Sequence, residues 1–387
     1  MFKEETPLSE QIAALYQDDL MPTEADLSRV QSAFNKLSKA LHQLYPPQNC
    51  LISVVPYGST INGLALKGED MSDLDVTLVF QNAAEWAKNV GQEIFSIQQK
   101  NRERDFLDYL KVMLPQKCID LTPRAYQPIQ ETSFGALLHI DDATDKVSIE
   151  LQINKVLDPY NSKLIQTYCL YDIRFHQLAL ILKKWNKSHF KDNTKRINSY
   201  SITLMLIAYL QHIKILPYLQ QLPVQRQEIC YFKHVFKGKA YQFGYNMKTD
   251  IAFETNPESI EKGFRDKERE QIKVEILLAG FFDFYLETFQ PQVHAIRICK
   301  GPSFIQRVGI MHHNYKDYVL DYLALYPKLQ SKLQDDEKRS ALVLIDPFDK
   351  GYNPGKTVSK GDWQEYKIQF QSALEALKRN RLDEIFC

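Results

Sequence analysis

The sequence predicts an α+β protein with two domains, a small α/β domain with a mixed sheet and a mainly helical domain. The chain has 387 residues, which is enough for two domains. Short apolar runs bounded by turn residues, which indicate strands, are concentrated between residues 51 and 153. Apolar residues recur at helical spacing before residue 46 and after residue 160. The predicted domains are therefore 46–160, and 1–45 with 161–387, facing each other across a cleft.

Helices are expected in the first 45 residues. Ser9 or Thr23 is a candidate N-cap, and apolar residues recur every three or four positions from 27 to 44. Pro46 and the proline that follows it end the second helix.

Two aspartates begin the second predicted strand, 73–80, which follows an apolar strand at 51–55, a Gly-Ser turn and a brief helical segment. Side chains two residues apart in a strand share a face, so Asp73 and Asp75 lie side by side, about 7 Å apart along the strand. Adjacent carboxylates repel each other unless a cation lies between them, and oxygen ligands of this kind suit Mg²⁺. A lone DxD pair is common in surface turns, but here it leads into an apolar run that indicates a buried strand.

Gly58 and Ser59 stand upstream of this strand. A flexible turn offers backbone N–H groups and a hydroxyl, which can hold a phosphate. A phosphate-binding turn together with a metal-binding strand is the minimum requirement for nucleotidyl transfer.

A β-hairpin is expected at 136–140 and 147–153, around the turn-rich segment Asp141-Asp142-Ala143-Thr144-Asp145. In its second strand Ser148, Glu150 and Gln152 share the polar face. If that face lies beside the aspartate strand, Glu150 becomes a third carboxylate over the metal. Otherwise Glu150 faces solvent on an amphipathic strand, and spacing alone leaves both interpretations open.

The remaining segments read mostly as helices. The predicted helices are 83–114, 164–172, 175–190, 199–213, 275–289 and 364–379, and the predicted short strands are 118–121, 296–299 and 343–345. Pro115 is expected to end the first of these helices. The segment 216–270 reads as polar and irregular, and its interleaved lysines and aromatics suit either single-stranded RNA or a docking loop.

Three residues of the helical part are candidates for nucleotide contact. Lys183 and Lys187 lie four residues apart on one helix face, so both can reach the same anion. The alternative is that they form a solvent-exposed basic edge of the helix, which is the usual role of such pairs. Tyr200 follows a helix start and could stack on a base or belong to the core.

Composition excludes several classes of protein. Lys plus Arg and Asp plus Glu both number 48, whereas a large nonspecific DNA binder is usually basic. The six cysteines are scattered without a CxxC pair, which argues against zinc and for reduced thiols inside the cell. The N-terminus lacks an apolar core and no run of 18 apolar residues occurs, so we expect an intracellular protein, cytoplasmic or nuclear. No cysteine or carboxylate stands at metal-ligand spacing from His312 and His313, so this pair is expected in a solvated loop.

The order of these motifs resembles that of the non-canonical poly(A) polymerases and terminal uridylyltransferases of the polymerase β-like nucleotidyltransferase superfamily. The GS…DLD segment resembles the metal motif, and IELQINKVLDPYNSKLIQTY resembles the strand of the third carboxylate. LALILKKWNK with INSYSITLMLIAYLQ resembles the nucleotide-clamping helices. ILLAGFFDFYLETF and LVLIDPFDKGYNPGKTV resemble the C-terminal associated domain and the nucleotide-recognition loop.

The resemblance implies a two-domain nucleotidyltransferase that adds UMP, favoured over AMP, to RNA 3′ ends without a template, using two Mg²⁺ or Mn²⁺ ions. Asp73, Asp75 and Glu150 would hold the metals. The implied nucleotide-binding residues are Gly58, Ser59, Asn161, Ser162, Lys183, Lys187, Ser199, Tyr200, Asp346, Asp349 and Tyr352. The implied partners are the RNA 3′ end, UTP or ATP, and a protein that delivers the RNA, because some members act beside RNA-silencing machinery.

Two residues depart from the family pattern. Glu150 stands where the family typically has aspartate, and Tyr352 stands where uridylyl-transferring members have a base-discriminating histidine. Glu150 is also the feature that favours the alternative, a non-catalytic scaffold of the same fold that binds RNA or a protein. An antibiotic or protein nucleotidyltransferase shares the GS…DxD pattern but not the later IDPFD loop.

Overall fold

The computed structural model describes residues 6–45, 52–68, 73–80, 99–124, 130–132, 135–192, 195–222, 228–237, 242–264, 269, 271–307 and 340–387. The chain forms two compact units, Met21–Gln166, and Met1–Leu20 with Thr167–Cys387. The predicted α+β class is confirmed. Residues 21–45, which the sequence boundaries assign to the helical domain, lie in the α/β unit. Residues 83–98 of the expected helix 83–114 and the pair His312-His313 lie outside the described residues.

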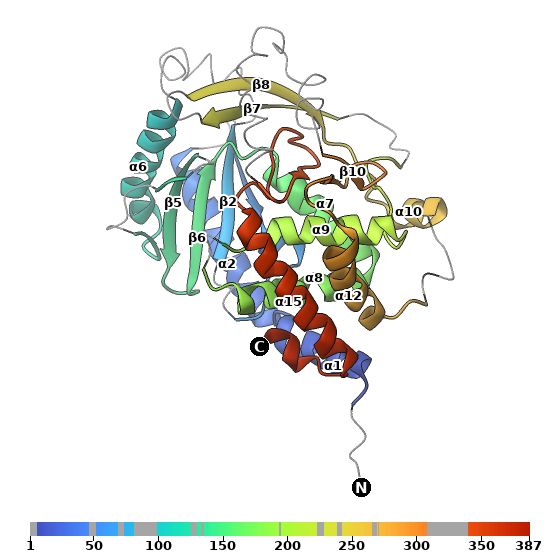
Figure 1. Cartoon of the computed structure of the whole chain (residues 1–387). Helices are drawn as coiled ribbons and strands as arrows, with labels where there is room; N and C mark the ends of the chain where they lie inside the picture. Colours follow the sequence, from blue (N-terminus) through green and yellow to red (C-terminus); the bar gives the residue numbers. More distant parts are fainter. Residues whose placement is uncertain are drawn as a thin grey trace. The chain divides into compact units, whose positions relative to one another are not determined.

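A mixed sheet forms the centre of the α/β unit, Met21–Gln166, and its middle strands run side by side in Figure 1. β2 and β6 pair in parallel, and the other neighbours are antiparallel, so the predicted hairpin of β5 and β6 is confirmed. The strand order is β1 (Ile52–Tyr57), β2 (Asp73–Phe80), β6 (Val147–Ile153), β5 (Gly135–Asp142) and β3 (Leu121–Pro123), with β4 (Gln130–Thr132) pairing β5. Burial alternates strictly along β6, where the apolar residues Val147 to Ile153 at every second position are buried and the polar residues between them are partly exposed.

Two helices bury the apolar face of this sheet. α2 (Glu24–Leu44) and α6 (Gln99–Lys117) contribute Leu37 and Leu110 to a core that includes Val76 and Leu151 of the strands. Thr23 caps α2 in a capping box with Asp26, as predicted. The other candidate cap, Ser9, lies inside α1 (Leu8–Ala14) and caps nothing.

Pro115 does not end α6, so that prediction is wrong. It lies in the last turn, and the helix continues to Lys117. A proline there removes only one backbone hydrogen bond, and its fixed φ is compatible with a helix. The strand expected at 118–121 begins at Leu121, because Cys118 first accepts a turn hydrogen bond from the Leu121 N–H.

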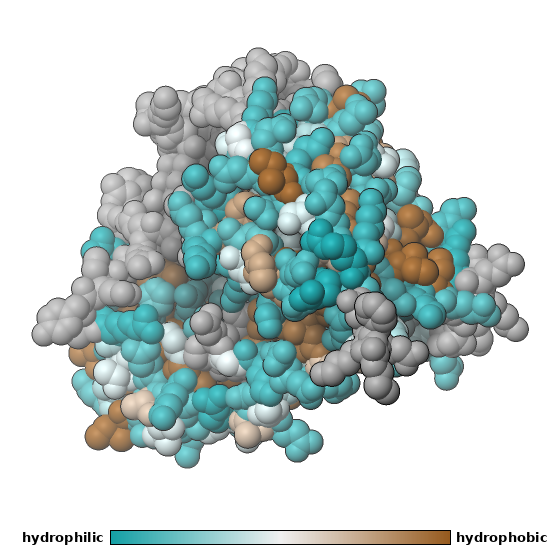
Figure 2. Space-filling view, turned by 60° about the horizontal axis from the view of Figure 1, so that its bottom comes forward, coloured by the Kyte–Doolittle hydropathy of each residue, from teal (hydrophilic) through white to brown (hydrophobic). Residues whose placement is uncertain are grey.

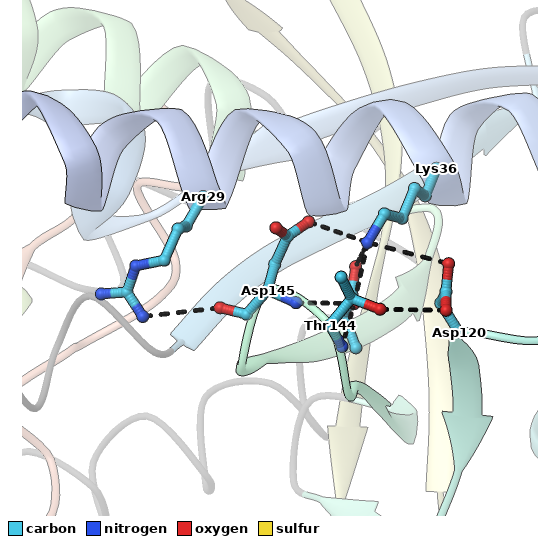
Figure 3. Close-up of polar contacts among 6 residues, drawn as sticks. Arg29, Lys36, Asp120, Thr144 and Asp145 are labelled. Carbon is cyan, nitrogen blue, oxygen red and sulfur yellow. Dashed lines mark hydrogen bonds and ion pairs between the residues drawn. The ribbon is translucent and has the colours of Figure 1, made fainter.

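Lys36 joins α2 to the turn between β5 and β6 (Figure 3). Its Nζ lies 2.9 Å from carboxylate oxygens of Asp142 and Asp145 and 4.0 Å from Asp120. Burial lowers the pKa of Lys36, but the hydrogen bonds to Asp142 and Asp145 outweigh burial and raise it overall. The helix is thus fixed against the sheet by an ion pair as well as by the core.

The other unit is mainly helical and carries two small sheets. Its helices are α1, α8 (Ile173–His189), α9 (Ser199–His212), α10 (Pro257–Phe264), α12 (Val274–Asp283) and α15 (Lys360–Lys378), with π-helical turns at Leu15–Leu20 and Phe284–Thr288 and a 3₁₀ turn at Asp383–Phe386. α7 (Asp158–Tyr171) spans the boundary between the two units. The sheets are β10 (Phe304–Gln306), β9 (His294–Arg297) and β11 (Leu344–Ile345), and the hairpin β7 (Ile229–Lys237) with β8 (Gln242–Asp250).

The hairpin contradicts the prediction that 216–270 is irregular. β7 and β8 pair over nine residues each, and α10 follows. β8 carries the alternation that is typical of a strand, with Phe243, Tyr245 and Met247 at every second position, and the interpretation of this segment as irregular missed it.

The core of the helical unit is aromatic. Trp185 of α8 packs against Phe282 of α12 and Phe370 of α15, with ring centroids 5.1 and 5.4 Å apart. The coloured residues on the face shown in Figure 2 are mainly hydrophilic. Among the described helices, none combines the length and the apolar character that crossing a membrane requires.

Candidate active site

Three carboxylates lie on the polar face of the α/β unit's sheet. Asp73 and Asp75 belong to β2, and Asp75 is the lateral partner of Glu150 on the parallel strand β6. Neighbouring strands lie about 4.8 Å apart, so the two backbones hold these side chains next to each other. Leu74 between the aspartates is fully buried, which fixes the aspartates on the opposite face. The structure therefore places Glu150 beside the aspartate strand.

The row of side chains through Asp75 continues across four strands. Tyr57 on β1 faces Asp75, and His139 on β5 faces Glu150. The Tyr57 hydroxyl donates a 3.0 Å hydrogen bond to Gln152. Burial raises the pKa of Tyr57, and the carboxylates of Asp75, Asp158 and Glu150 raise it further. Negative charge is therefore concentrated at this part of the sheet.

The donor atoms of this face suit a divalent cation. Asp73 is exposed, and Asp75 and Glu150 are half-buried, so all three combine hard oxygen ligands with access to solvent. In the described part of the chain, no group of three or more His, Cys, Asp or Glu side chains converges closely enough to form a metal site by itself. The arrangement fits an ion such as Mg²⁺, which one or two carboxylates hold together with substrate oxygens.

Gly58 connects the sheet to the short helix α3 (Ser59–Asn62). It has φ of 80°, and its N–H donates a 2.9 Å hydrogen bond to Ser162 Oγ, which in turn donates to the Asp158 carbonyl. A Cβ atom at Gly58 would overlap Oδ2 of Asp75 and lie 3.0 Å from its Cγ, so only glycine fits. The Gly58 N–H, expected to hold a phosphate, is thus used inside the protein to fix this turn.

Two residues beside the carboxylates were missed by sequence reasoning. Arg124 Nε donates hydrogen bonds to both carboxylate oxygens of Asp141, and Nη2 donates to Asp141 Oδ1 and, at 2.9 Å, to Ser148 Oγ. These bonds to Asp141, and the nearby charges of Asp73 and Glu150, raise the pKa of Arg124. The second is His139, which the observed register of β5 and β6 places opposite Glu150.

Four of the predicted nucleotide-binding residues come together in the helical unit. Asp346 is 2% exposed and accepts hydrogen bonds from the backbone N–H groups of Phe348 and Asp349 and from the Tyr200 hydroxyl, the last at 2.7 Å. Tyr352 closes the same turn, because its N–H donates to the Asp349 carbonyl and its carbonyl accepts from the Asp346 N–H. Burial, and then the charge of Asp349, raise the pKa of Asp346 to about 7.

The other predicted residues lie on helices. Lys183 and Lys187 are on α8, the first buried and the second half-buried. Ser199 begins α9, whose N-cap is Asn198. Asn161 lies in α7, where it is 8% exposed.

Comparison with known proteins agrees with this geometry. Residues 8–170 match the family model "Poly(A) RNA polymerase, mitochondrial-like, central palm domain". The chain is 27% identical to Poly(A) RNA polymerase gld-2 of Caenorhabditis elegans over 84% of its own length. It is 25% identical to caffeine-induced protein 16 of Schizosaccharomyces pombe over 95% of its own length. The chain spans only 25% of the length of each of these two relatives.

Solved structures share the fold over nearly the whole chain. The structure of a cytoplasmic RNA terminal U-transferase aligns with a TM-score of 0.68 and 18% identity, covering 98% of both chains. The structure of Cid1 with the UTP analogue UMPNPP aligns with a TM-score of 0.65 and 18% identity, covering 98% of this chain and 97% of the other. The chain therefore resembles poly(A) RNA polymerases in residues 8–170, and it shares the fold of the terminal U-transferase structures over nearly its whole length.

Proposed function

We propose that this protein is a template-independent nucleotidyltransferase that adds UMP, in preference to AMP, to RNA 3′ ends. The observation that carries the proposal is the lateral pairing of Asp75 with Glu150, with Asp73 on the same face of the sheet. Carboxylates on one face of two neighbouring strands repel each other, and a bound cation would offset that repulsion. The names of the relatives and fold neighbours, poly(A) polymerase and terminal U-transferase, support the same reaction class.

Asp73, Asp75 and Glu150 would hold Mg²⁺ or Mn²⁺, as the donor chemistry allows. Two bound ions would supply a lowered pKa of the attacking RNA 3′-hydroxyl and charge stabilisation at the α-phosphate. The protein's own contribution is to fix the ligands. Gly58 leaves the space that the Asp75 carboxylate occupies, and the hydrogen bond to Ser162 keeps that turn in place.

The Asp346 turn would select the base. The Tyr200 hydroxyl is fixed by Asp346, which orients the ring for stacking on a base. Tyr352 is half-buried in the same turn, and its phenol can donate a hydrogen bond to O4 of uracil or accept one from the amino group of adenine. The resemblance to uridylyl-transferring members includes the length of this loop, and this favours UTP.

Incubation of the purified protein with a short labelled RNA, Mg²⁺ or Mn²⁺ and each NTP separately tests the proposal. Extension with UTP, faster than with ATP at equal concentration, is the expected result. Faster extension with ATP would contradict the nucleotide assignment alone. RNA binding without extension by any NTP would contradict catalysis and support the scaffold alternative.

A further inference from the structure

The carboxylate of Glu150 has a lateral neighbour that no part of the proposed reaction yet uses. Glu150 and His139 form a direct antiparallel pair between β6 and β5. Nδ1 of His139 lies 3.7 Å from Oε1 of Glu150. This is too long for a hydrogen bond, but a small rotation of either side chain would form one. We propose that His139 is a positioning residue that orients the Glu150 carboxylate toward the metal ions, an inference that rests on the proposed function.

The environment of the imidazole supports this role. The His139 side chain is 13% exposed, compared with 39% for Glu150. Among the described residues, its Nε2 is buried and has no hydrogen-bond partner. A buried polar atom without a partner is costly, so a histidine at this position needs a reason other than stability. Nδ1, the other ring nitrogen, lies on the side of Glu150, 3.7 Å from Oε1.

The position of Glu150 explains why it requires such a neighbour. Glu150 lies between Asp75 on one side and His139 on the other. The charge of Asp75 repels the Glu150 carboxylate, and the longer side chain has one more rotatable bond than aspartate through which to turn away. A ring N–H on the far side limits that rotation. Arg124, which bonds Asp141 and Ser148, adds positive charge to the same region but does not contact Glu150 by a hydrogen bond in the described structure.

The inference predicts that His139 matters because residue 150 is glutamate. His139→Ala should lower kcat for RNA extension and weaken Mn²⁺ binding by roughly 10- to 100-fold, the usual range for a residue that orients a metal ligand. His139→Asn should retain most of the kcat and most of the Mn²⁺ affinity, because the amide nitrogen of asparagine replaces Nδ1 of histidine. Combined with Glu150→Asp, the His139→Ala change should cost about 3-fold or less, since the shorter carboxylate cannot reach His139.

The experiment measures kcat for RNA extension and the affinity for Mn²⁺ in the full chain. Mn²⁺ binding is detected by electron paramagnetic resonance in the presence of a non-hydrolysable UTP analogue. His42→Ala, an exposed histidine on α2, is the matched control and should leave both unchanged. Melting temperatures identify any variant that fails to fold, and His139→Asn then provides the comparison. Equal losses from His139→Ala in the Glu150 and Glu150→Asp backgrounds, or wild-type Mn²⁺ binding by His139→Ala, would overturn the inference. If the wild type extends no RNA, the proposed function fails, while the Mn²⁺ comparison still decides the role of His139.

Discussion

Gly58→Ala is expected to damage activity far more than stability. Gly58 has φ of 80°, and an added Cβ would lie 3.0 Å from Cγ of Asp75 and overlap its Oδ2. Residues forced into such backbone conformations cost about 1–3 kcal/mol. The Asp75 carboxylate would have to move by about 1 Å, and a displacement of that size at a reacting centre costs on the order of 100-fold in rate.

Gly68→Ala separates the two effects. Gly68 also has a positive φ, of 86°, but an added Cβ meets nothing within 4 Å. Both variants should lose comparable free energy of unfolding in urea, whereas only Gly58→Ala should lose about 100-fold in kcat/KM for RNA extension. Equal activity of the two variants would refute the view that Gly58 exists to make room for Asp75.

Three further substitutions test other parts of the account. Lys36→Ala should cost about 2 kcal/mol in urea unfolding, because it leaves the Asp142 carboxylate, 0% exposed, without its cation, whereas the exposed Lys39→Ala should change little. The pKa of Asp346 is raised from 3.8 to about 7, so between about pH 4 and 7 its carboxyl group is protonated in the folded state and ionised in the unfolded state. The free energy of unfolding therefore falls as pH rises through this range. Asp346→Asn should flatten that slope in melting temperatures recorded across this range, and an unchanged slope would exclude Asp346 as its source. Tyr352→His should raise the UTP-to-ATP rate ratio, and an unchanged ratio would remove Tyr352 from base selection.

Much of the fold is predictable because burial of one face leaves a local pattern. The three-to-four spacing after Thr23 defines α2, and the alternation in β6 defines a strand whose apolar residues are all buried. The pairing of β7 with β8 depends on contacts between two segments, although β8 itself has a local pattern, because Phe243, Tyr245 and Met247 alternate with small or polar residues. Pro115 is misleading for another reason, because its effect depends on its distance from the helix end.

The candidate site is predictable only where it is local. Asp73 and Asp75 share a face by strand geometry alone, so their pairing follows from two positions in the sequence. Whether Glu150 joins them depends on the strand order, which places β6 beside β2. The bond between Tyr200 and Asp346 joins residues 146 positions apart, and no pattern in either segment indicates it.

The central claim is that the carboxylates of β2 carry metal-dependent transfer of a nucleotide to RNA. Its most direct test is extension of a labelled RNA with Mg²⁺ and UTP by the wild type and by Asp73→Ala combined with Asp75→Ala. Asp18→Ala with Asp19→Ala, two exposed aspartates of the helical unit, is the matched control. Extension that is abolished in the first variant, with its melting behaviour retained, and kept in the control is the predicted result. Undiminished extension by the Asp73 and Asp75 double variant would contradict the claim.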